Sequence, residues 1–208
     1  SPRSYNSQVG VPLSVWLMNE QTQVGVFEAG ISQPGEMQAL RDIIQPTIGI
    51  LTNLGSAHQE NFPSMAAKCK EKLTLFHDTQ AVVYCQDDEL VNRCMSEFAY
   101  HGEQLAWSVK NDKAAFFVKS IEKKDITTTV TYVYNGKTEG RYSIPFIDEA
   151  SVTNSIVSAI AALYLGITTG QLAERMAKLE PVAMRLEVKE GQHGCTLIND
   201  RSEERRVG

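Results

Sequence analysis

The first half of the chain carries side chains that could bind a metal ion and its phosphates. Glu28 stands where the apolar run VGVF ends in a glycine-bearing turn, and His58 follows the run IGILTN, which ends at Asn53. Carboxylate oxygens hold Mg²⁺ against nucleotide phosphates, and imidazole is a common metal ligand. Taken singly, a solvated turn carboxylate and an ordinary loop histidine are the commoner explanations of Glu28 and His58.

Lys72 lies in the lysine-rich stretch AAKCKEKLTLF. Because Lys68, Lys70 and Glu71 stand beside it, the ordinary interpretation is a solvated helix face. Lysine has a second capacity, since burial or a neighbouring charge can lower its pKa and leave a neutral, nucleophilic amine. Such an amine can add carbon dioxide and become a carbamate, which is an anionic metal ligand.

A complete phosphate-binding loop is absent from the 208 residues of the sequence. The string NGKT at 135–138 contains the end of a Walker A motif, but Thr131 occupies the position of its first glycine. The string also separates two strand-like runs instead of preceding a helix. We therefore assign Asn135 and Gly136 to a hairpin turn, for which this dipeptide is the strongest short signal.

The elements that would position these groups alternate in type along the chain. Short β-branched runs at 24–30, 48–53 and 81–85 are separated by helical patterns at 34–44 and through Phe76. This alternation predicts an α/β fold whose parallel sheet is covered by helices on both faces, with right-handed crossovers. Ligands bind beyond the carboxyl ends of such strands, so the loops that carry Glu28 and His58 are expected to meet at one crevice.

The later part of the chain changes character. A helical stretch opens at Asp87 and Asp88, and four strand-like runs within 104–146 predict an antiparallel subsheet attached to the parallel one. Helical periodicity returns at 152–165 and 169–179 and ends before Pro181. We expect a central domain over residues 1–180, the start of a second domain over 181–200 with strands in RLEVKE and CTLIND, and a non-native tail over 201–208.

The overall composition excludes several classes of protein. A net charge of -5 argues against nucleic acid as the main partner, because phosphate neutralisation needs a basic surface. The cysteines at 69, 85, 94 and 195 form no CxxC pair and no paired framework, which predicts reduced thiols and a cytoplasmic protein. No run approaches the ~20 apolar residues of a membrane span. The chain opens on Ser1 without a leader, so we expect that upstream sequence is missing.

Together these motifs resemble the central ATPase domain of the Mur ligase family, from just after the Walker A helix, over Ser4 to Asp200. The string EAGISQPGEM resembles the E-x-G and G-E-[IM] of the MurF branch. The MurD and MurE branches usually have a serine pair after the glutamate, and folylpolyglutamate synthases have a glycine-rich continuation. The opening SYNSQVGVPLSV resembles the family segment before I-G-x-P, above all in members fused to alanine racemase.

The resemblance implies a role for each matching residue. TNLGSAHQENFPS and AAKCKEKLTLF resemble the segments with the metal-binding histidine and the carbamoylated lysine, so Glu28, His58 and carbamoylated Lys72 would hold Mg²⁺ at the catalytic centre. SVTNSIVSAIAA resembles H-N-x-x-N-x-x-A-A, which implies that Asn154 contacts adenine, although Ala150-Ser151 replaces the His-Asn pair.

The resemblance also covers both ends of the chain. MRLE resembles G-R-[LF]-E and implies that Arg185 contacts nucleotide phosphate, and LIND resembles L-[ILV]-[DN]-D and implies that Asp200 lies near the ribose or the hinge. Asn6 and Ser7 of the opening segment are expected to bind substrate. Arg201 departs from the usual S-Y-N continuation, as expected where foreign sequence begins.

The activity implied is ATP-dependent amide formation in peptidoglycan precursor synthesis. D-alanyl-D-alanine would be joined to UDP-N-acetylmuramoyl-tripeptide through an acyl phosphate, by a monomeric cytoplasmic enzyme. Two alternatives stay open: another ligase of the superfamily, of the MurE or folylpolyglutamate synthase type, and a noncatalytic Mur-like binding module. Without the Walker A lysine, the isolated chain is expected to be inactive.

Overall fold

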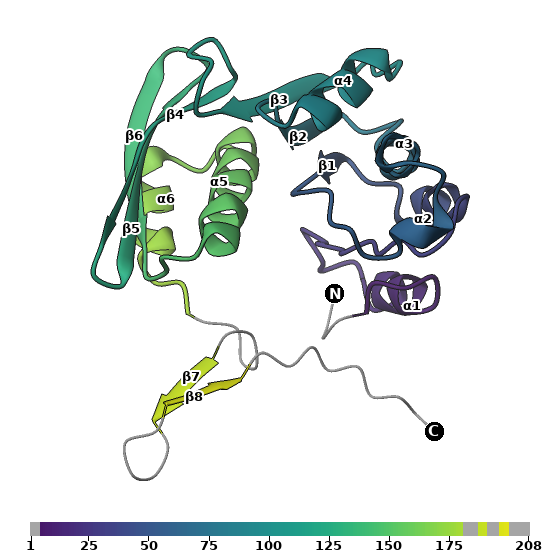
Figure 1. Ribbon diagram of the computed structural model, residues 1–208, viewed down its shortest axis with the longest axis horizontal. Coiled ribbons are helices and arrows are strands. Elements are labelled where there is room, and N and C mark those ends of the chain that lie inside the picture. Colours follow the sequence, from purple (N-terminus) through teal and green to yellow (C-terminus); the bar gives the residue numbers. More distant parts are fainter. Residues whose placement is uncertain (1–4, 181–186, 191–195, 200–208) are drawn as a thin grey trace.

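The computed structural model describes residues 5–180, 187–190 and 196–199 (Figure 1). Its helices are α1 (Gly10–Trp16), α2 (Glu36–Ile44), α3 (Met65–Thr74), α4 (Glu89–Glu97), α5 (Glu149–Tyr164) and α6 (Thr169–Met176), with a 3-10 turn η1 (Gln59–Asn61). Its strands are β1 (Ile48–Ile50), β2 (Ala81–Cys85), β3 (Glu103–Ser108), β4 (Phe116–Lys124), β5 (Thr127–Tyr134), β6 (Thr138–Ile144), β7 (Glu187–Glu190) and β8 (Thr196–Asn199). Within the described ranges, no helix is long and apolar enough to cross a membrane.

The strands β1 to β6 form one mixed sheet in sequence order. Neighbours from β1 to β4 are parallel, whereas β4, β5 and β6 are antiparallel. The predicted parallel sheet with an antiparallel extension is therefore confirmed. The prediction for β3 is wrong, because this strand belongs to the parallel part. The reason is the connection between β2 and β3, which runs through helix α4. A helical crossover brings the chain back to the same end of the sheet, so β3 runs parallel to β2.

The segment 24–30 is not a strand, which corrects a second prediction. The side chains of Val24 and Val26 are 67% and 74% exposed, so this run has no buried face. The strand preference of β-branched residues depends on side-chain packing and burial, which this exposed run lacks. The segment is instead held at its end, where the Gly30 amide donates a hydrogen bond of 2.7 Å to the Asn6 carbonyl.

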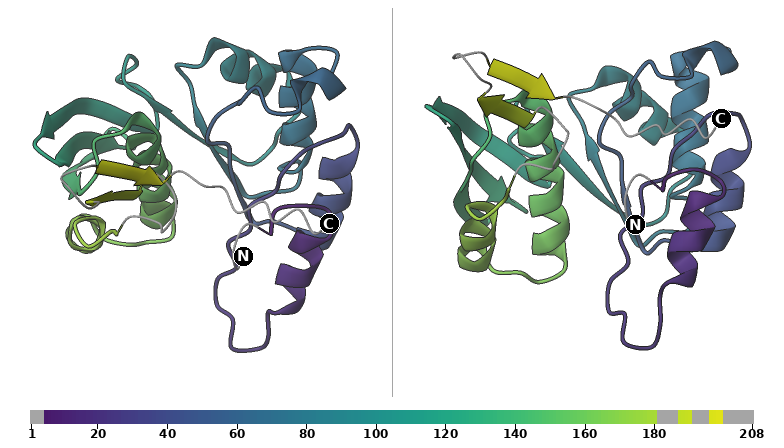
Figure 2. Two further views of the ribbon diagram at one scale, coloured as in Figure 1. Left: turned by 60° about the horizontal axis from the view of Figure 1, so that its bottom comes forward. Right: turned by 90° about the horizontal axis from the view of Figure 1, so that it is seen from below.

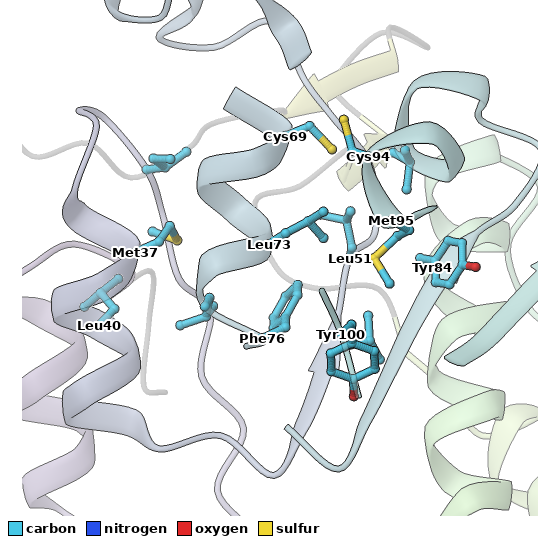
Figure 3. Packing of buried hydrophobic residues seen from close by; sticks show 14 of the residues in the cluster. Met37, Leu40, Leu51, Cys69, Leu73, Phe76, Tyr84, Cys94, Met95 and Tyr100 are labelled. Carbon is cyan, nitrogen blue, oxygen red and sulfur yellow. The ribbon is translucent and has the colours of Figure 1, made fainter. Parts of the chain in front are cut away.

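Helices cover both faces of the sheet (Figure 2). Along β2 the side chains alternate, so that Val82 and Tyr84 join the apolar cluster under α2, α3 and α4. Ala81 and Val83 join the cluster under α5 and α6. Figure 3 shows the first cluster, in which Leu51, Leu73 and Phe76 point into the same space between α3 and the sheet. Burying each large apolar side chain contributes about 1.5–3 kcal/mol, so both helical layers stabilise the sheet.

The predicted helix start at Asp88 and the predicted hairpin turn are both confirmed. The Asp88 carboxylate accepts hydrogen bonds of 3.0 Å from two amides in the first turn of α4, satisfying donors that a helix leaves free. Asn135 and Gly136 have φ values of 50° and 64°, the left-handed geometry of a tight hairpin. The NGKT string is thus the turn between β5 and β6, as predicted.

In the second predicted domain, β7 and β8 pair antiparallel.

Candidate active site

Helix α3 lies between two loops that carry predicted site residues. We call residues 51–58 the β1 loop, because they follow β1, and residues 28–35 the Glu28 loop. The buried Lys68 ammonium donates hydrogen bonds to the carbonyls of Gly55 at 2.6 Å and Ala57 at 2.5 Å in the β1 loop. On the same helix, Glu71 Oε1 accepts hydrogen bonds from the amides of Gly35 at 2.8 Å and Met37 at 3.2 Å. Both loops are therefore tied to one helix.

Lys72 is half-buried on α3, one turn beyond Lys68. Burial lowers the pKa of its amine, and the positive charge of Lys68 lowers it further. The carboxylate of Glu28 acts on this pKa in the opposite direction, because its negative charge favours the ammonium form. Glu28 and Lys72 are far apart in the sequence, yet the fold makes them electrostatic neighbours.

The Glu28 carboxylate is oriented from the opening segment. Asn6 Nδ2 donates a hydrogen bond of 2.9 Å to Glu28 Oε1, and the Asn6 carbonyl accepts from Gly30. A Cβ added at Gly30 would lie 3.1 Å from that carbonyl, so the two segments approach closely. Ser7 Oγ accepts a hydrogen bond of 3.1 Å from the Gly10 amide at the start of α1. Asn6 and Ser7, predicted to bind substrate, thus have partners within the chain.

His58 is exposed in the left-handed conformation, with φ 57°, directly before η1. It follows Ala57, whose carbonyl Lys68 binds, so the β1 loop brings it to the N-terminal half of α3. The next residue, Gln59, has a buried Oε1 with no hydrogen-bond partner among the described residues. The turn at His58 therefore has an oxygen acceptor that the described chain leaves unsatisfied.

The remaining predicted site residues are not brought to this point by the described structure. Asn154 is exposed on α5, which covers the opposite face of the sheet from α3. Arg185 and Asp200 lie outside the described residues. Sequence reasoning also missed Lys68 and Glu71, which it named only as part of a solvated face. Lys68 lies four residues before Lys72 and three before Glu71, and residues at these spacings share one side of a helix, but the spacing gives no sign that Lys68 is buried or that Glu71 binds a loop.

The model of the Mur ligase middle domain matches residues 1–162. The chain belongs to the Mur ligase family. It is 24% identical over 200 residues to the UDP-N-acetylmuramoyl-tripeptide--D-alanyl-D-alanine ligase of Bacillus subtilis (strain 168), covering 95% of this chain and 42% of the relative. The enzyme of the same name from Borreliella burgdorferi is 27% identical over 201 residues, covering 94% and 41%. The chain therefore spans about two fifths of the length of these relatives.

Solved structures of the family share the fold. A MurF crystal structure from Acinetobacter baumannii superposes with a TM-score of 0.77 at 21% identity, covering 92% of this chain and 41% of that one. The MurF ligase from Thermotoga maritima in complex with ADP gives a TM-score of 0.75 at 20% identity, covering 92% and 44%. The predicted fold class, a Mur ligase central domain, is confirmed.

The donor set of the site fits a divalent cation on one condition. Across the described parts of the chain, no three His, Cys, Asp or Glu side chains gather closely enough to hold a metal ion. Glu28 supplies carboxylate oxygens and His58 an imidazole, but the third position is the amine of Lys72. A carbamate on Lys72 would replace that amine with oxygens, the ligands that Mg²⁺ prefers. The Mur ligase site thus suits Mg²⁺ if Lys72 is carbamoylated.

Proposed function

We propose that this chain is the central part of an ATP-dependent ligase of the MurF type. The enzyme would join D-alanyl-D-alanine to UDP-N-acetylmuramoyl-tripeptide as a cytoplasmic monomer. The observation that carries the proposal is the match of residues 1–162 to the Mur ligase middle domain. The half-buried Lys72 fits it, because burial lowers the pKa of this amine while the charge of Glu28 acts in the opposite direction. The names of the relatives support the choice of substrates.

Carbamate formation is the first step that the chain itself would perform. A neutral Lys72 Nζ bonds to the carbon of CO₂ and releases one proton to water, which leaves a carbamate with one negative charge. Burial of Lys72 assists this step, because it disfavours the ammonium form. Glu28, His58 and the carbamate would then hold Mg²⁺, which neutralises phosphate charge when it is bound.

Ligation proceeds through two displacements. The γ-phosphoryl group of ATP passes to a carboxylate oxygen of the tripeptide, and ADP leaves. The amine nitrogen of D-alanyl-D-alanine then attacks the acyl carbon, phosphate leaves, and the nitrogen loses a proton. Such transfers depend mainly on positioning and charge neutralisation. We assign the adenine contact to Asn154, nucleotide contacts to Arg185 and Asp200, and substrate contacts to Asn6 and Ser7.

We also propose the division of the chain into a central domain over 1–180, the beginning of a C-terminal domain over 181–200, and a non-native tail over 201–208. Sequencing the source DNA across codon 201 tests the tail. A break in similarity to independent clones at that codon is expected. An unbroken frame shared by independent clones would show that the tail is native.

Substitution of Lys72 in the full-length ligase tests the function. Lys72→Ala is expected to abolish ligation, and Lys72→Glu to restore part of it, because a carboxylate returns near the position of the carbamate. Lys70→Ala is the matched control, since Lys70 points to solvent and pairs with Glu97 at 2.7 Å. Near-normal turnover of Lys72→Ala, measured as ADP release with D-alanyl-D-alanine present, would refute the assignment.

Two further measurements complete the test. Glu28→Ala should lose Mg²⁺-dependent activity while the circular dichroism spectrum stays native, and unchanged metal dependence would count against Glu28 as a ligand. Acceptor profiling should show amide formation with D-alanyl-D-alanine. Formation with a diamino acid or with glutamate instead would identify a MurE-type or folylpolyglutamate-type ligase.

A further inference from the structure

Two side chains of α3 bind loop backbone and have no assigned role in the reaction. Lys68 is only 2% exposed, and its ammonium donates to the carbonyls of Gly55 and Ala57, two residues that are themselves exposed. Glu71 accepts from the amides of Gly35 and Met37, where the Glu28 loop enters α2. Lys68 and Glu71, which we call the two anchors, therefore each bind one of the two loops that carry His58 and Glu28.

Lys68 is a charged side chain in a buried position. Desolvating an ammonium group is costly, and an apolar residue of similar size often stabilises a buried position equally well. Among the described residues no carboxylate forms an ion pair with Lys68, so loop carbonyls are its partners. The contacts of the Lys68 ammonium are therefore with the β1 loop.

Side chains also form hydrogen bonds with the backbone of the Glu28 loop. Glu36 Oε2 accepts hydrogen bonds from the amides of Ser32 at 2.6 Å and Gln33 at 2.9 Å. Asn61 Nδ2 donates to the Ser32 carbonyl at 2.9 Å and so joins this loop to η1, beside the β1 loop. The hydrogen bonds that Glu71 accepts then connect the Glu28 loop to α3, the helix that carries Lys72.

We propose that Lys68 and Glu71 are positioning residues that fasten the β1 loop and the Glu28 loop to α3, so that His58 and Glu28 are held beside Lys72. The role of these loops in metal binding rests on the proposed function. The fastening itself does not, because it concerns the motion of the two loops in the chain as it stands.

Loop motion in the 208-residue chain gives the first test. In Lys68→Met, ¹⁵N relaxation should show order parameters of the amides at 55–58 falling from about 0.85 to below about 0.6. Lys70→Met is the matched control, because it makes the same substitution on the exposed side of α3, and its loop amides should stay rigid. Unchanged order parameters in Lys68→Met would overturn the proposal for Lys68.

Glu71 supplies an independent pair of variants, which also serves if Lys68→Met does not fold. Glu71→Gln keeps an Oε1 acceptor for Gly35 and Met37, so the Glu28 loop should stay rigid. Glu71→Ala removes the acceptor, and the amides at 29–33 and 35 should become mobile. Equal order parameters in the two variants would overturn the proposal for Glu71.

Metal binding separates this proposal from the proposed function. Mn²⁺ titrations of the chain in bicarbonate buffer, followed by electron paramagnetic resonance, should show binding at least threefold weaker in Lys68→Met than in Lys70→Met. A smaller difference, with Mn²⁺ bound by the unmodified chain, would overturn the positioning role. If the unmodified chain binds no Mn²⁺, the proposed metal site fails, and the order parameters alone decide whether the anchors exist.

Discussion

Gly49, in the middle of β1, offers a sharp test of the packing behind the β1 loop. It is buried, and a Cβ added to it would lie 2.4 Å from Cδ1 and 2.6 Å from Cγ of Phe76. Phe76 belongs to the apolar cluster under α3 and is itself buried, as Figure 3 shows. Real Cβ atoms essentially never approach another heavy atom so closely, so Gly49→Ala must displace the ring or the strand.

The size of the effect follows from two opposing contributions. Overpacking a core costs about 1–3 kcal/mol. Replacing glycine by alanine lowers the conformational entropy of the unfolded chain, which offsets about 0.4–1 kcal/mol of the overpacking cost. The net loss of stability for Gly49→Ala is therefore about 1–2 kcal/mol, and at about 2–4 °C per kcal/mol the Tm should fall by roughly 2–8 °C.

The same substitution should have the opposite sign at Gly170. This residue lies in the first turn of α6, is exposed, and has no atom within 4 Å of the added Cβ. Glycine inside a helix is about 0.5–1 kcal/mol less favourable than alanine, so Gly170→Ala should raise the Tm. Thermal unfolding followed by circular dichroism compares both variants with the parent chain.

A double-mutant cycle tests the cause of the loss. Phe76→Leu vacates part of the space that the new methyl group would enter, so Gly49→Ala should cost less in that background. The two changes should couple by about 0.5–3 kcal/mol. The reasoning is refuted if Gly49→Ala melts at or above the parent chain, or if the two changes are additive.

Three other predictions concern single contacts. Asn6→Ala removes the hydrogen bond to Glu28 and should weaken Mn²⁺ binding by about 10–100-fold. Gln38→Ala, which removes an exposed amide–carboxylate contact of 2.8 Å on α2, should leave Mn²⁺ binding unchanged. Asp88→Ala removes the N-cap of α4 and should cost about 1 kcal/mol in urea unfolding, whereas an unchanged midpoint would contradict the cap. Burial raises the pKa of Cys69 from 9.0 to about 12, so the folded state favours the thiol, and this stabilisation is lost as pH rises from 9.0 to about 12. Iodoacetamide at pH 8.5 should label Cys69 in urea but not in the native chain, as measured by mass spectrometry.

Local pattern was sufficient for elements whose residues decide their own conformation. The run at 81–85 is apolar on both faces because β2 lies between two helical layers, and its composition already showed this. The turn at Asn135 and Gly136 needs two left-handed residues, which few other dipeptides supply. The cap at Asp88 likewise depends on one side chain and the amides that follow it.

Predictions failed where a partner distant in sequence decides the outcome. The segment 24–30 has strand composition, but its valine side chains are exposed, and strand preference depends on packing and burial by the rest of the fold. The direction of β3 is set by the crossover through α4 and leaves no trace in the pattern of the strand. At the site, the order of strand ends predicted that the loops of Glu28 and His58 share one crevice, and only the family resemblance added Lys72. Nothing local to Asn6 indicated that its amide binds Glu28.

The lysines of α3 show why the anchors could not be found from the sequence. Cys69 is fully buried and marks the inward side of the helix. Lys68 and Lys70 are each one residue from it, about 100° to either side, so they flank the apolar stripe symmetrically. On one flank the carbonyls of the β1 loop surround Lys68, and on the other Glu97 of α4 pairs with Lys70 at 2.7 Å near solvent. Helix periodicity predicts that these two lysines take opposite sides, but only the tertiary neighbours decide which one is buried.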